Sequence, residues 1–254
     1  MILSALHSPF SRPALLAVIL LALPAPKARA DIALETETGD LGKKGESNFS
    51  QGIQFDHDPD GHTAFLLTQY EYAITDNCEI LIEPFFYQWT KLKDGTSYEG
   101  IGDLEITSAF KFIQETETFP AIVASLKVKV PMASNREIGT GKFDYYPYFT
   151  INKHLGEWDL NVNLGVEFFG QTNGDPHQRN QLIYDFAAQH PITDKLEFFV
   201  EVFGNTKPAA GEKGTFAGAV ALEYEFGKHF NVFLSVGYDT DKTFSVRPGF
   251  NIPF

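Results

Sequence analysis

The last eight residues, Arg247-Pro248-Gly249-Phe250-Asn251-Ile252-Pro253-Phe254, decide the fold class. Apolar side chains occupy every second position of this stretch, and polar or small ones lie between them. A period of two is typical of a strand with one apolar and one polar face. The end of a soluble domain usually frays and is polar, whereas this chain ends on an aromatic strand. Taken alone, the stretch also fits the closing strand of a soluble sandwich.

The same stretch resembles the C-terminal assembly signal of bacterial outer-membrane β-barrels. Gly249, Ile252 and Phe254 each occupy the position that this signal assigns to their residue type. The resemblance implies insertion by the barrel-assembly machinery, with outer-membrane lipid around the folded chain.

A signal for export lies near the opposite end of the chain. An uncharged apolar run at 14–23 follows Arg12, and Ala28-Arg29-Ala30 offers small residues before a cut at Asp31. This arrangement predicts a cleaved secretory signal peptide over 1–30. No later segment approaches the roughly 20 consecutive apolar residues of a membrane helix. We therefore expect an exported protein of the outer membrane of a Gram-negative cell.

Composition and charge narrow the classes further. Hydrophobic residues at 43% and aromatic residues at 14% exclude a disordered chain. Mean hydropathy is nevertheless -0.15, as expected when only alternate strand residues face lipid. The formal net charge of -13 argues against nucleic acid as a partner, because phosphate binding needs clustered cations. The single cysteine, Cys78, leaves stability to a closed strand ladder rather than to disulfides.

Strand patterns with a period of two follow one another along the mature chain. Short turns alternate with longer polar loops, as they do in bacterial barrels. We expect an all-β fold, a transmembrane antiparallel barrel of about twelve strands over 48–254. The patterns lie at 49–55, 66–74, 80–86, 104–112, 122–130, 143–151, 158–168, 182–189, 196–202, 220–226, 230–238 and 246–254. The longer loops are expected at 91–99, 133–141, 171–180 and 205–213.

Residues 31–47, before the first strand pattern, are polar and glycine-rich. We expect a flexible periplasmic lead-in. The alternative is a segment that folds back into the pore as a small plug.

The polar faces of the predicted strands would line the lumen. They carry thirteen acidic and four basic side chains, which predicts a field that favours cations or neutral solutes over anions. Glu105 and Lys127 lie where they can pair. The alternative is a closed barrel filled by salt bridges, because twelve strands fall between packed and water-filled barrels. The predicted pore-lining residues are Asp56, Glu71, Glu79, Glu83, Asp103, Glu105, Lys111, Lys127, Lys129, Asp159, Glu167, Asp185, Glu197, Glu201, Glu223, Glu225 and Arg247.

Aromatic residues also fall on the predicted lumen face. They would give small aromatic or apolar solutes a surface to slide along, or they could serve only as packing. These residues are Phe85, Tyr87, Tyr146, Tyr148, Phe169, Phe199 and Phe203.

Several short motifs resemble one family of outer-membrane barrels. They are Gly100-Ile101-Gly102-Asp103-Leu104-Glu105, Leu126-Lys127-Val128-Lys129-Val130-Pro131, Asn161-Val162-Asn163-Leu164-Gly165 and Pro248-Gly249-Phe250. Over about 50–254 the chain is similar to the family labelled "putative meta-pathway of phenol degradation", which includes the channel of a functional-amyloid secretion system. The resemblance implies a twelve-stranded barrel and transport. Met132 and Ala133 stand where the family commonly has Thr-Gly, and no helical extension like that of the amyloid channel precedes Ser50.

An enzyme site is harder to place. A lipid-active enzyme of the outer membrane would need a nucleophile beside His57, His62 or His177, and no Gly-x-Ser-x-Gly motif accompanies them. The acidic run at 56–62 lacks the later carboxylate of a calcium loop, so we expect a solvated turn there. We expect no catalytic residue, no metal and no cofactor. The expected function is a monomeric channel for passive passage of small solutes, with a lipid-active enzyme or a closed structural barrel as alternatives.

Overall fold

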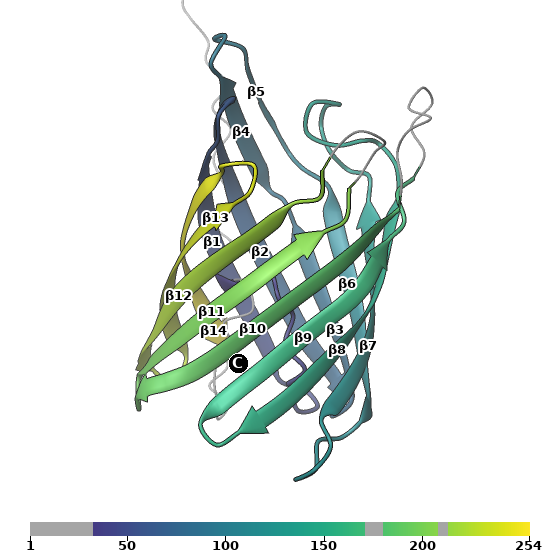
Figure 1. Ribbon diagram of the computed structural model, residues 1–254, viewed down its shortest axis with the longest axis vertical. Coiled ribbons are helices and arrows are strands. Elements are labelled where there is room, and N and C mark those ends of the chain that lie inside the picture. The colour runs from purple at the N-terminus through teal and green to yellow at the C-terminus, as the bar shows by residue number, and fades with distance from the viewer. Residues whose placement is uncertain (1–32, 171–179, 208–212) are drawn as a thin grey trace, which may run out of the picture.

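The computed structural model describes residues 33–170, 180–207 and 213–254. In these residues, fourteen strand segments form one antiparallel sheet, which closes on itself because β1 pairs with both β14 and β2 (Figure 1). The signal peptide expected at 1–30 lies outside the described residues. The strands are β1 Ser47–His57, β2 Gly61–Thr75, β3 Cys78–Pro84, β4 Tyr87–Leu92, β5 Ser97–Gly100, β6 Leu104–Ile113, β7 Ala121–Val130, β8 Asp144–Leu155, β9 Trp158–Glu167, β10 Gln181–Thr193, β11 Leu196–Asn205, β12 Phe216–Gly227, β13 Phe230–Asp239 and β14 Phe244–Pro253.

Two of the barrel strands are interrupted, so the fourteen segments make a barrel of twelve strands. Strand β2 pairs with β3 along one half, where Tyr70 faces Ile82, and with β4 along the other half, where Leu66 faces Tyr87. Strand β6 continues the line of β5 in the same way, since β6 pairs with β3 and β5 pairs with β4. The closed twelve-stranded barrel confirms the predicted fold class. No helix in the described ranges is long and apolar enough to cross a membrane.

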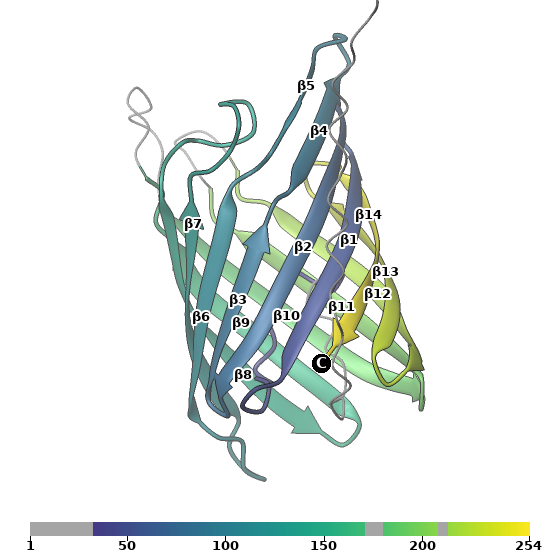
Figure 2. The ribbon, with the colours of Figure 1, turned by 180° about the vertical axis from the view of Figure 1, so that it is seen from behind.

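The long loop expected at 91–99 is wrong. This part of the chain belongs to the β4–β5 hairpin, which extends the wall above the end of β3 (Figure 2). Asp94-Gly95 lies in its turn, and Gly95 has a φ of +92°, which glycine adopts without strain. The polar composition of the hairpin conceals its strand period in the sequence.

The interruption between β3 and β4 also changes which side chains point inward. Glu83 and Phe85 line a cavity in the lumen, and strict alternation would place Tyr87 there as well. Tyr87 instead pairs with Leu66 and is 43% exposed. A shift of one residue in a strand moves every following side chain to the other face. The expected lumen position of Tyr87 is therefore wrong.

The barrel has its apolar side chains outside and its polar ones inside. On β6 and β8, Phe110 and Phe149 are each 53% exposed, whereas Thr107 and Thr150 on the other face of these strands are buried. A soluble sandwich would bury its apolar face against a second sheet. An apolar outer wall is what a transmembrane barrel presents to lipid.

One edge of the barrel carries the short turns and the C-terminal residue, and we call it the turn end; the opposite edge is the loop end. Aromatic rings follow one another around the turn end from β12 to β1, as in the interfacial belts of membrane proteins. Their centroids are 4.9 to 6.3 Å apart in the order Tyr224, Phe226, Phe230, Phe250 and Phe49.

Candidate functional site: a lumen occupied by residues 33–46

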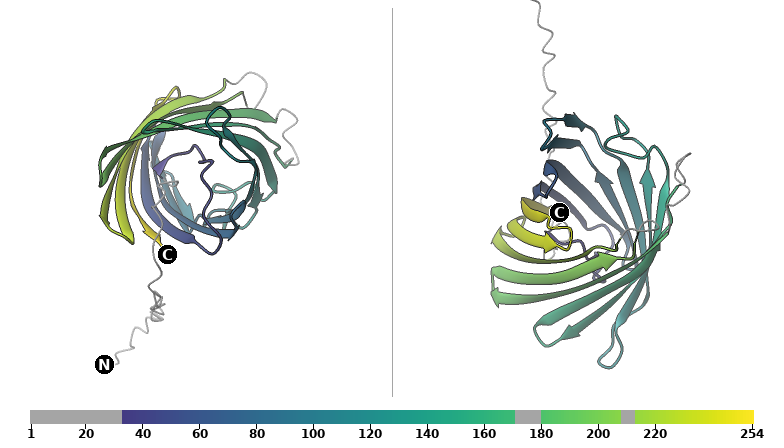
Figure 3. Two further views of the ribbon diagram at one scale, coloured as in Figure 1. Left: turned by 90° about the horizontal axis from the view of Figure 1, so that it is seen from below. Right: turned by 45° about the horizontal axis from the view of Figure 1, so that its top comes forward.

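Residues 33–46, which we call the plug segment, lie inside the barrel. Viewed from below, the segment (purple) runs within the ring of strands (Figure 3). The flexible periplasmic lead-in expected at 31–47 is therefore wrong for the described part of that range, and the alternative of a plug is what the structure shows. The physical reason is that this glycine-rich backbone offers many N–H donors, and the lumen wall offers carboxylates and amides that accept them.

The first part of the plug segment is held by Glu201 on β11. Its carboxylate accepts hydrogen bonds from the main-chain N–H of Glu35 at 3.0 Å and of Thr36 at 3.1 Å, and from the Thr36 hydroxyl at 3.0 Å. Arg247 on β14 forms an ion pair with Glu35 and lowers the pKa of that carboxyl below its usual value. Charge-assisted bonds of this kind are the stronger ones in proteins.

Lys127 on β7 gathers three carboxylates around one ammonium group. Its Nζ lies 3.5 Å from Glu37 of the plug segment, 3.1 Å from Glu83 and 3.4 Å from Glu105. The pair of Glu105 and Lys127 expected from the sequence is thus present. Because like charges repel at this distance, Lys127 makes it possible for Glu37 to lie beside two other acids.

Asparagines on β9 bind the backbone in the middle of the plug segment. Asn163 accepts the N–H of Glu37 at 2.7 Å and donates to its carbonyl at 3.0 Å, and Asn161 accepts the N–H of Gly39 at 2.9 Å. Gly39 lies so close to the wall that a Cβ there would be 2.3 Å from the Cβ of Asn152. Only glycine fits at this point.

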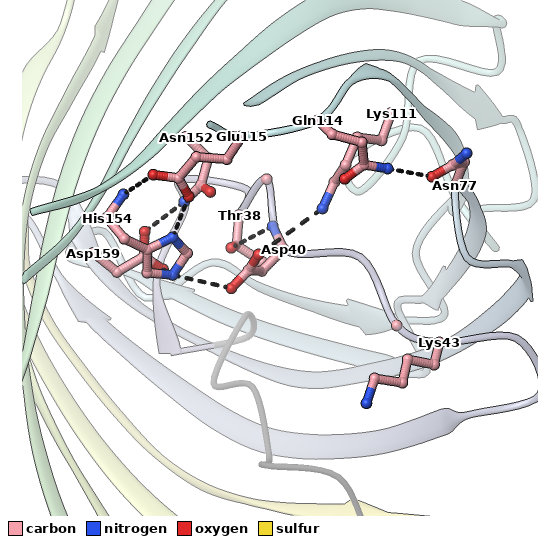
Figure 4. A network of polar contacts seen from close by, with 12 residues as sticks. Thr38, Asp40, Lys43, Asn77, Lys111, Gln114, Glu115, Asn152, His154 and Asp159 are labelled. Carbon is pink, nitrogen blue, oxygen red and sulfur yellow. Dashed lines mark hydrogen bonds and ion pairs between the residues drawn. The ribbon is translucent and has the colours of Figure 1, made fainter. Parts of the chain in front are cut away.

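The last part of the plug segment contacts a polar network at the turn end (Figure 4). The Asp40 carboxylate lies 3.3 Å from His154 Nε2 and 3.9 Å from Lys111 Nζ. The Gly42 N–H donates to the Glu79 carboxylate at 2.8 Å. This end is therefore bound by side chains from β3, β6 and β8.

Two small apolar clusters also hold the plug segment against the barrel wall. They bury Ala33 and Leu41 of a mostly polar segment, and Leu34 packs against the first cluster, which adds a modest hydrophobic contribution to its binding. Ala33 packs with Phe199, Ala221 and Phe233, and Leu41 packs with Ala109 and Val123.

Two cavities border the plug segment. One of about 230 Å³ lies beside Glu35 and Glu37, against the interruption of the wall at Pro84 and Phe85. The other, of about 1070 Å³, opens at the turn end and is lined by Asp40 and by acids of the wall. The larger volume lies just above the usual range of sites that hold small molecules, about 300 to 1,000 Å³.

The expected pore-lining residues all lie on the inner face, none of them exposed. Three of the four bases, Lys111, Lys127 and Arg247, contact the plug segment, and the fourth, Lys129, pairs with Asp103 at 3.8 Å and with Asp144. Glu71, Glu79, Asp103, Lys111, Asp159, Glu201 and Glu223 are buried. Asp56, Glu83, Glu105, Lys127, Lys129, Glu167, Asp185, Glu197, Glu225 and Arg247 are half-buried.

Sequence reasoning missed the asparagines and one aromatic ring. Asn161 and Asn163 are buried on the inner face of β9, and Phe233 on β13 is 4% exposed. A Cβ at Gly249 would meet the Phe233 ring at 2.2 Å, so this ring lies over a glycine of the expected assembly signal. Asparagine is depleted in strands, so two of them two residues apart were the available signal.

The other expected site residues are distributed as follows. Ile252 and Phe254 lie at the end of β14, where the Phe254 N–H donates to the Ser47 carbonyl at 2.8 Å. Their role in assembly stays a prediction. Tyr148 and Phe199 are buried in the lumen, and Phe85, Tyr146, Phe169 and Phe203 are half-buried.

The histidines considered for catalysis lie at the loop end. His57 and His62 face each other across the β1–β2 turn with stacked rings 4.5 Å apart, and His177 lies outside the described residues. In the same turn, the Asp58 carboxylate accepts the N–H groups of Asp60 and Gly61 at 2.6 and 2.8 Å. The expected turn with solvated acids is present.

A sequence model of one protein family matches this chain. The family described as "Putative MetA-pathway of phenol degradation" matches residues 72–251, which is more than half of the sequence. The chain belongs to this family. Among curated protein sequences, none gives a significant match.

Solved structures share the fold of this family member at low sequence identity. An outer membrane channel from Pseudomonas putida F1 has a TM-score of 0.72 at 12% identity, over 87% of this chain and 100% of that chain. The KdgM porin has a TM-score of 0.57 at 13% identity, over 81% and 99%. The NanC porin has a TM-score of 0.57 at 9% identity, over 80% and 98%. All three are similar in fold, and they are described as one channel and two porins.

Proposed function

We propose that this protein is an outer-membrane channel for the passive passage of small solutes. The observation that carries the proposal is a closed barrel with an apolar outer wall and an acid-rich lumen that contains cavities on both sides of a docked plug segment. The family and the shared fold of a channel and two porins support it. The turn end, with Phe254, would face the periplasm, since barrels of this class have short periplasmic turns.

The lining of the two cavities suggests which solutes pass. The larger cavity is lined by Glu71, Glu79, Glu197, Glu223 and Glu225, whose field disfavours anions. The smaller cavity has apolar walls besides its charged groups, which suits a small apolar or aromatic group. Those apolar residues are Leu34, Phe65, Leu67, Pro84 and Phe85. Small cationic or neutral solutes, including small aromatic compounds, are the proposed cargo.

Assembly and surroundings belong to the same proposal. The protein would insert through the barrel-assembly machinery by its closing strand, with Gly249, Ile252 and Phe254 as the recognised positions. A closed twelve-stranded barrel satisfies its own backbone hydrogen bonds in lipid, so a monomer suffices.

Conductance across a planar bilayer under a salt gradient tests the proposal. The mature protein is compared with a variant that lacks residues 33–42, in each case after folding is shown by heat-modifiable migration on a gel. We expect the deletion to give the larger conductance by roughly tenfold, with a reversal potential that indicates cation selectivity.

Charge variants in the deletion background sharpen this test. Replacing Glu197 and Glu225 by Gln removes two acids of the larger cavity and should lower the cation selectivity. Glu137→Gln is the matched control, because Glu137 is exposed in the loop between β7 and β8. A folded deletion variant without conductance would contradict a passive channel.

A further inference from the structure

The turn end of the lumen brings together three metal-ligand side chains from three elements. Asp40 belongs to the plug segment, His154 to the end of β8 and Asp159 to the start of β9 (Figure 4). The carboxylates of Asp40 and Asp159 lie 3.3 and 3.8 Å from His154 Nε2. One ligand atom from each of the three residues lies within 4.8 Å of the other two.

These separations fit one shared cation. In a tetrahedral zinc site with bonds of about 2.0 to 2.2 Å, ligand atoms are about 3.3 to 3.6 Å apart. The three side chains therefore need only small adjustments to hold one ion. All three also line the larger cavity, so water can take the fourth position.

The orientation of His154 is set by a second carboxylate. Glu115, in the connection between β6 and β7, lies 2.6 Å from His154 Nδ1 and accepts the His154 main-chain N–H at 2.9 Å. Glu115 is placed to accept a proton from Nδ1, so that in the neutral imidazole Nε2 is the nitrogen that can bind a metal beside Asp40 and Asp159. Metal-binding histidines commonly have such a carboxylate partner.

The carboxylate of Asp159 is also held in place. Asp159 is 6% exposed and accepts hydrogen bonds from Asn152 and, at 2.5 Å, from Gln189. Two carboxylates converge on one imidazole nitrogen, an arrangement that is neutralised either by a protonated His154 or by a bound cation. Lys111 is 3.9 Å from the other oxygen of Asp40, so it leaves the oxygen that faces His154 available.

We propose that Asp40, His154 and Asp159 bind one divalent transition-metal cation of the zinc class, which fastens the plug segment to the barrel wall. One ligand is on the plug segment and two are on the wall, so the ion binds the docked arrangement best and stabilises it by linkage. No metal is expected from the sequence, because Asp40 is far from His154 and Asp159 in the chain and the three show no ligand motif. Metal binding does not depend on whether the protein conducts.

Zinc titration of the folded, detergent-solubilised mature protein tests the site. We expect one Zn²⁺ per chain, measured by calorimetry, and weaker binding by roughly tenfold or more in Asp40→Asn and in His154→Ala. Two controls separate this site from other ligands. Asp76→Asn removes a carboxylate that accepts the Lys44 N–H of the plug segment, and His57→Ala removes the histidine pair at the loop end.

The outcomes decide the proposal. Binding that is lost in Asp40→Asn and His154→Ala but kept in both controls supports it. Absence of Zn²⁺ binding to the folded wild type, or binding lost only in His57→Ala, overturns it. Asp40 lies outside the barrel strands, so its substitution leaves the fold of the barrel intact.

A second readout tests the fastening itself. Lys43 and Lys44 are exposed at the turn end and offer trypsin a cleavage site in the plug segment. We expect Zn²⁺ to slow this cleavage in the wild type compared with chelator, and to have no effect in Asp40→Asn. Cleavage that Zn²⁺ leaves unchanged in a wild type that binds it would show that the ion does not fasten the plug segment.

Discussion

The two ends of the plug segment are held by different chemistry. At residues 35–37 the partners are Arg247, Lys127 and the carboxylate of Glu201. At residues 39–42 they are main-chain hydrogen bonds to Asn161 and Glu79, and the group around His154. The cations of the first end stay charged over the physiological range, whereas histidine changes charge near neutrality. Residues 35–37 are therefore a fixed anchor, held by charges that do not change near neutral pH. The contact of residues 39–42 with His154 can change with pH.

Loss of the fixed anchor should have the largest effect. Lys127→Met leaves Glu37, Glu83 and Glu105 together without their shared cation. Removing one partner of a buried ion group costs about 3 to 5 kcal/mol, so docking of the plug segment should weaken by at least about a hundredfold. The measurement is the rise in bilayer conductance towards that of the variant lacking residues 33–42.

Lys129→Met is the control for this substitution. Lys129 lies on the same strand and face two residues further on, but it pairs with Asp103 and Asp144 instead of the plug segment. It should leave the conductance near that of the wild type. Equal increases in the two variants would show that general disturbance of the lumen, rather than loss of the anchor, opens the barrel.

A smaller effect is expected where the plug segment crosses the wall between its two ends. Gly39→Ala places a Cβ 2.3 Å from that of Asn152, and overpacking of this kind typically costs about 1 to 3 kcal/mol. The hydrogen bond from Gly39 to Asn161 should lengthen, and trypsin should cleave the segment faster. Lys44→Arg, at an exposed position of the same segment, is the control for substitution alone, because arginine keeps the trypsin site. Unchanged cleavage in Gly39→Ala would mean that the segment passes the wall less closely than the structure shows.

The sequence predicts the strands of the barrel wall far better than it predicts the plug segment inside the barrel. Alternation placed Phe110 outside and Glu201 inside because a strand has a strict period of two, and the pattern repeats in each of twelve strands. It failed at Tyr87, because a one-residue shift at the strand break leaves no mark on composition. Residues 91–99 of the β4–β5 hairpin were expected in a loop for another reason, because their polar composition conceals the strand period.

The plug segment could not be placed from its own sequence. Most of its side chains are polar and its three apolar ones follow no strand or helix period, so the sequence predicts a mobile lead-in. The segment is held by hydrogen bonds to residues far away in the chain, such as those from Thr36 to Glu201 and from Glu37 to Asn163. A surplus of acids in the predicted lumen was visible, but the sequence alone does not show that Lys127 and Arg247 bind acids of the plug segment.

The smallest effect is expected from lowering the pH, which protonates Glu35 in the part of the plug segment at residues 35–37. Arg247 lowers the pKa of Glu35 below its usual 4.5, and Lys127 acts in the same direction. The undocked segment, with an ordinary Glu35, therefore takes up a proton first as the pH falls. The contribution of Glu35 to docking is complete above pH 4.5 and is lost as the pH falls through the lowered pKa.

Conductance measured between about pH 5 and pH 3 should therefore rise more steeply in the wild type than in Glu35→Gln, which lacks this group. The Glu35 side chain is 47% exposed, so water screens its pair with Arg247 and limits the effect to about 1 kcal/mol or less. Glu35→Gln keeps the main-chain hydrogen bond from residue 35 to Glu201, so the two proteins differ in the side chain of residue 35. Identical pH profiles would show that any rise in conductance at low pH comes from groups of the lumen wall and that the charge of Glu35 does not contribute to docking. The difference between the two ends of the plug segment would then depend on Lys127 alone.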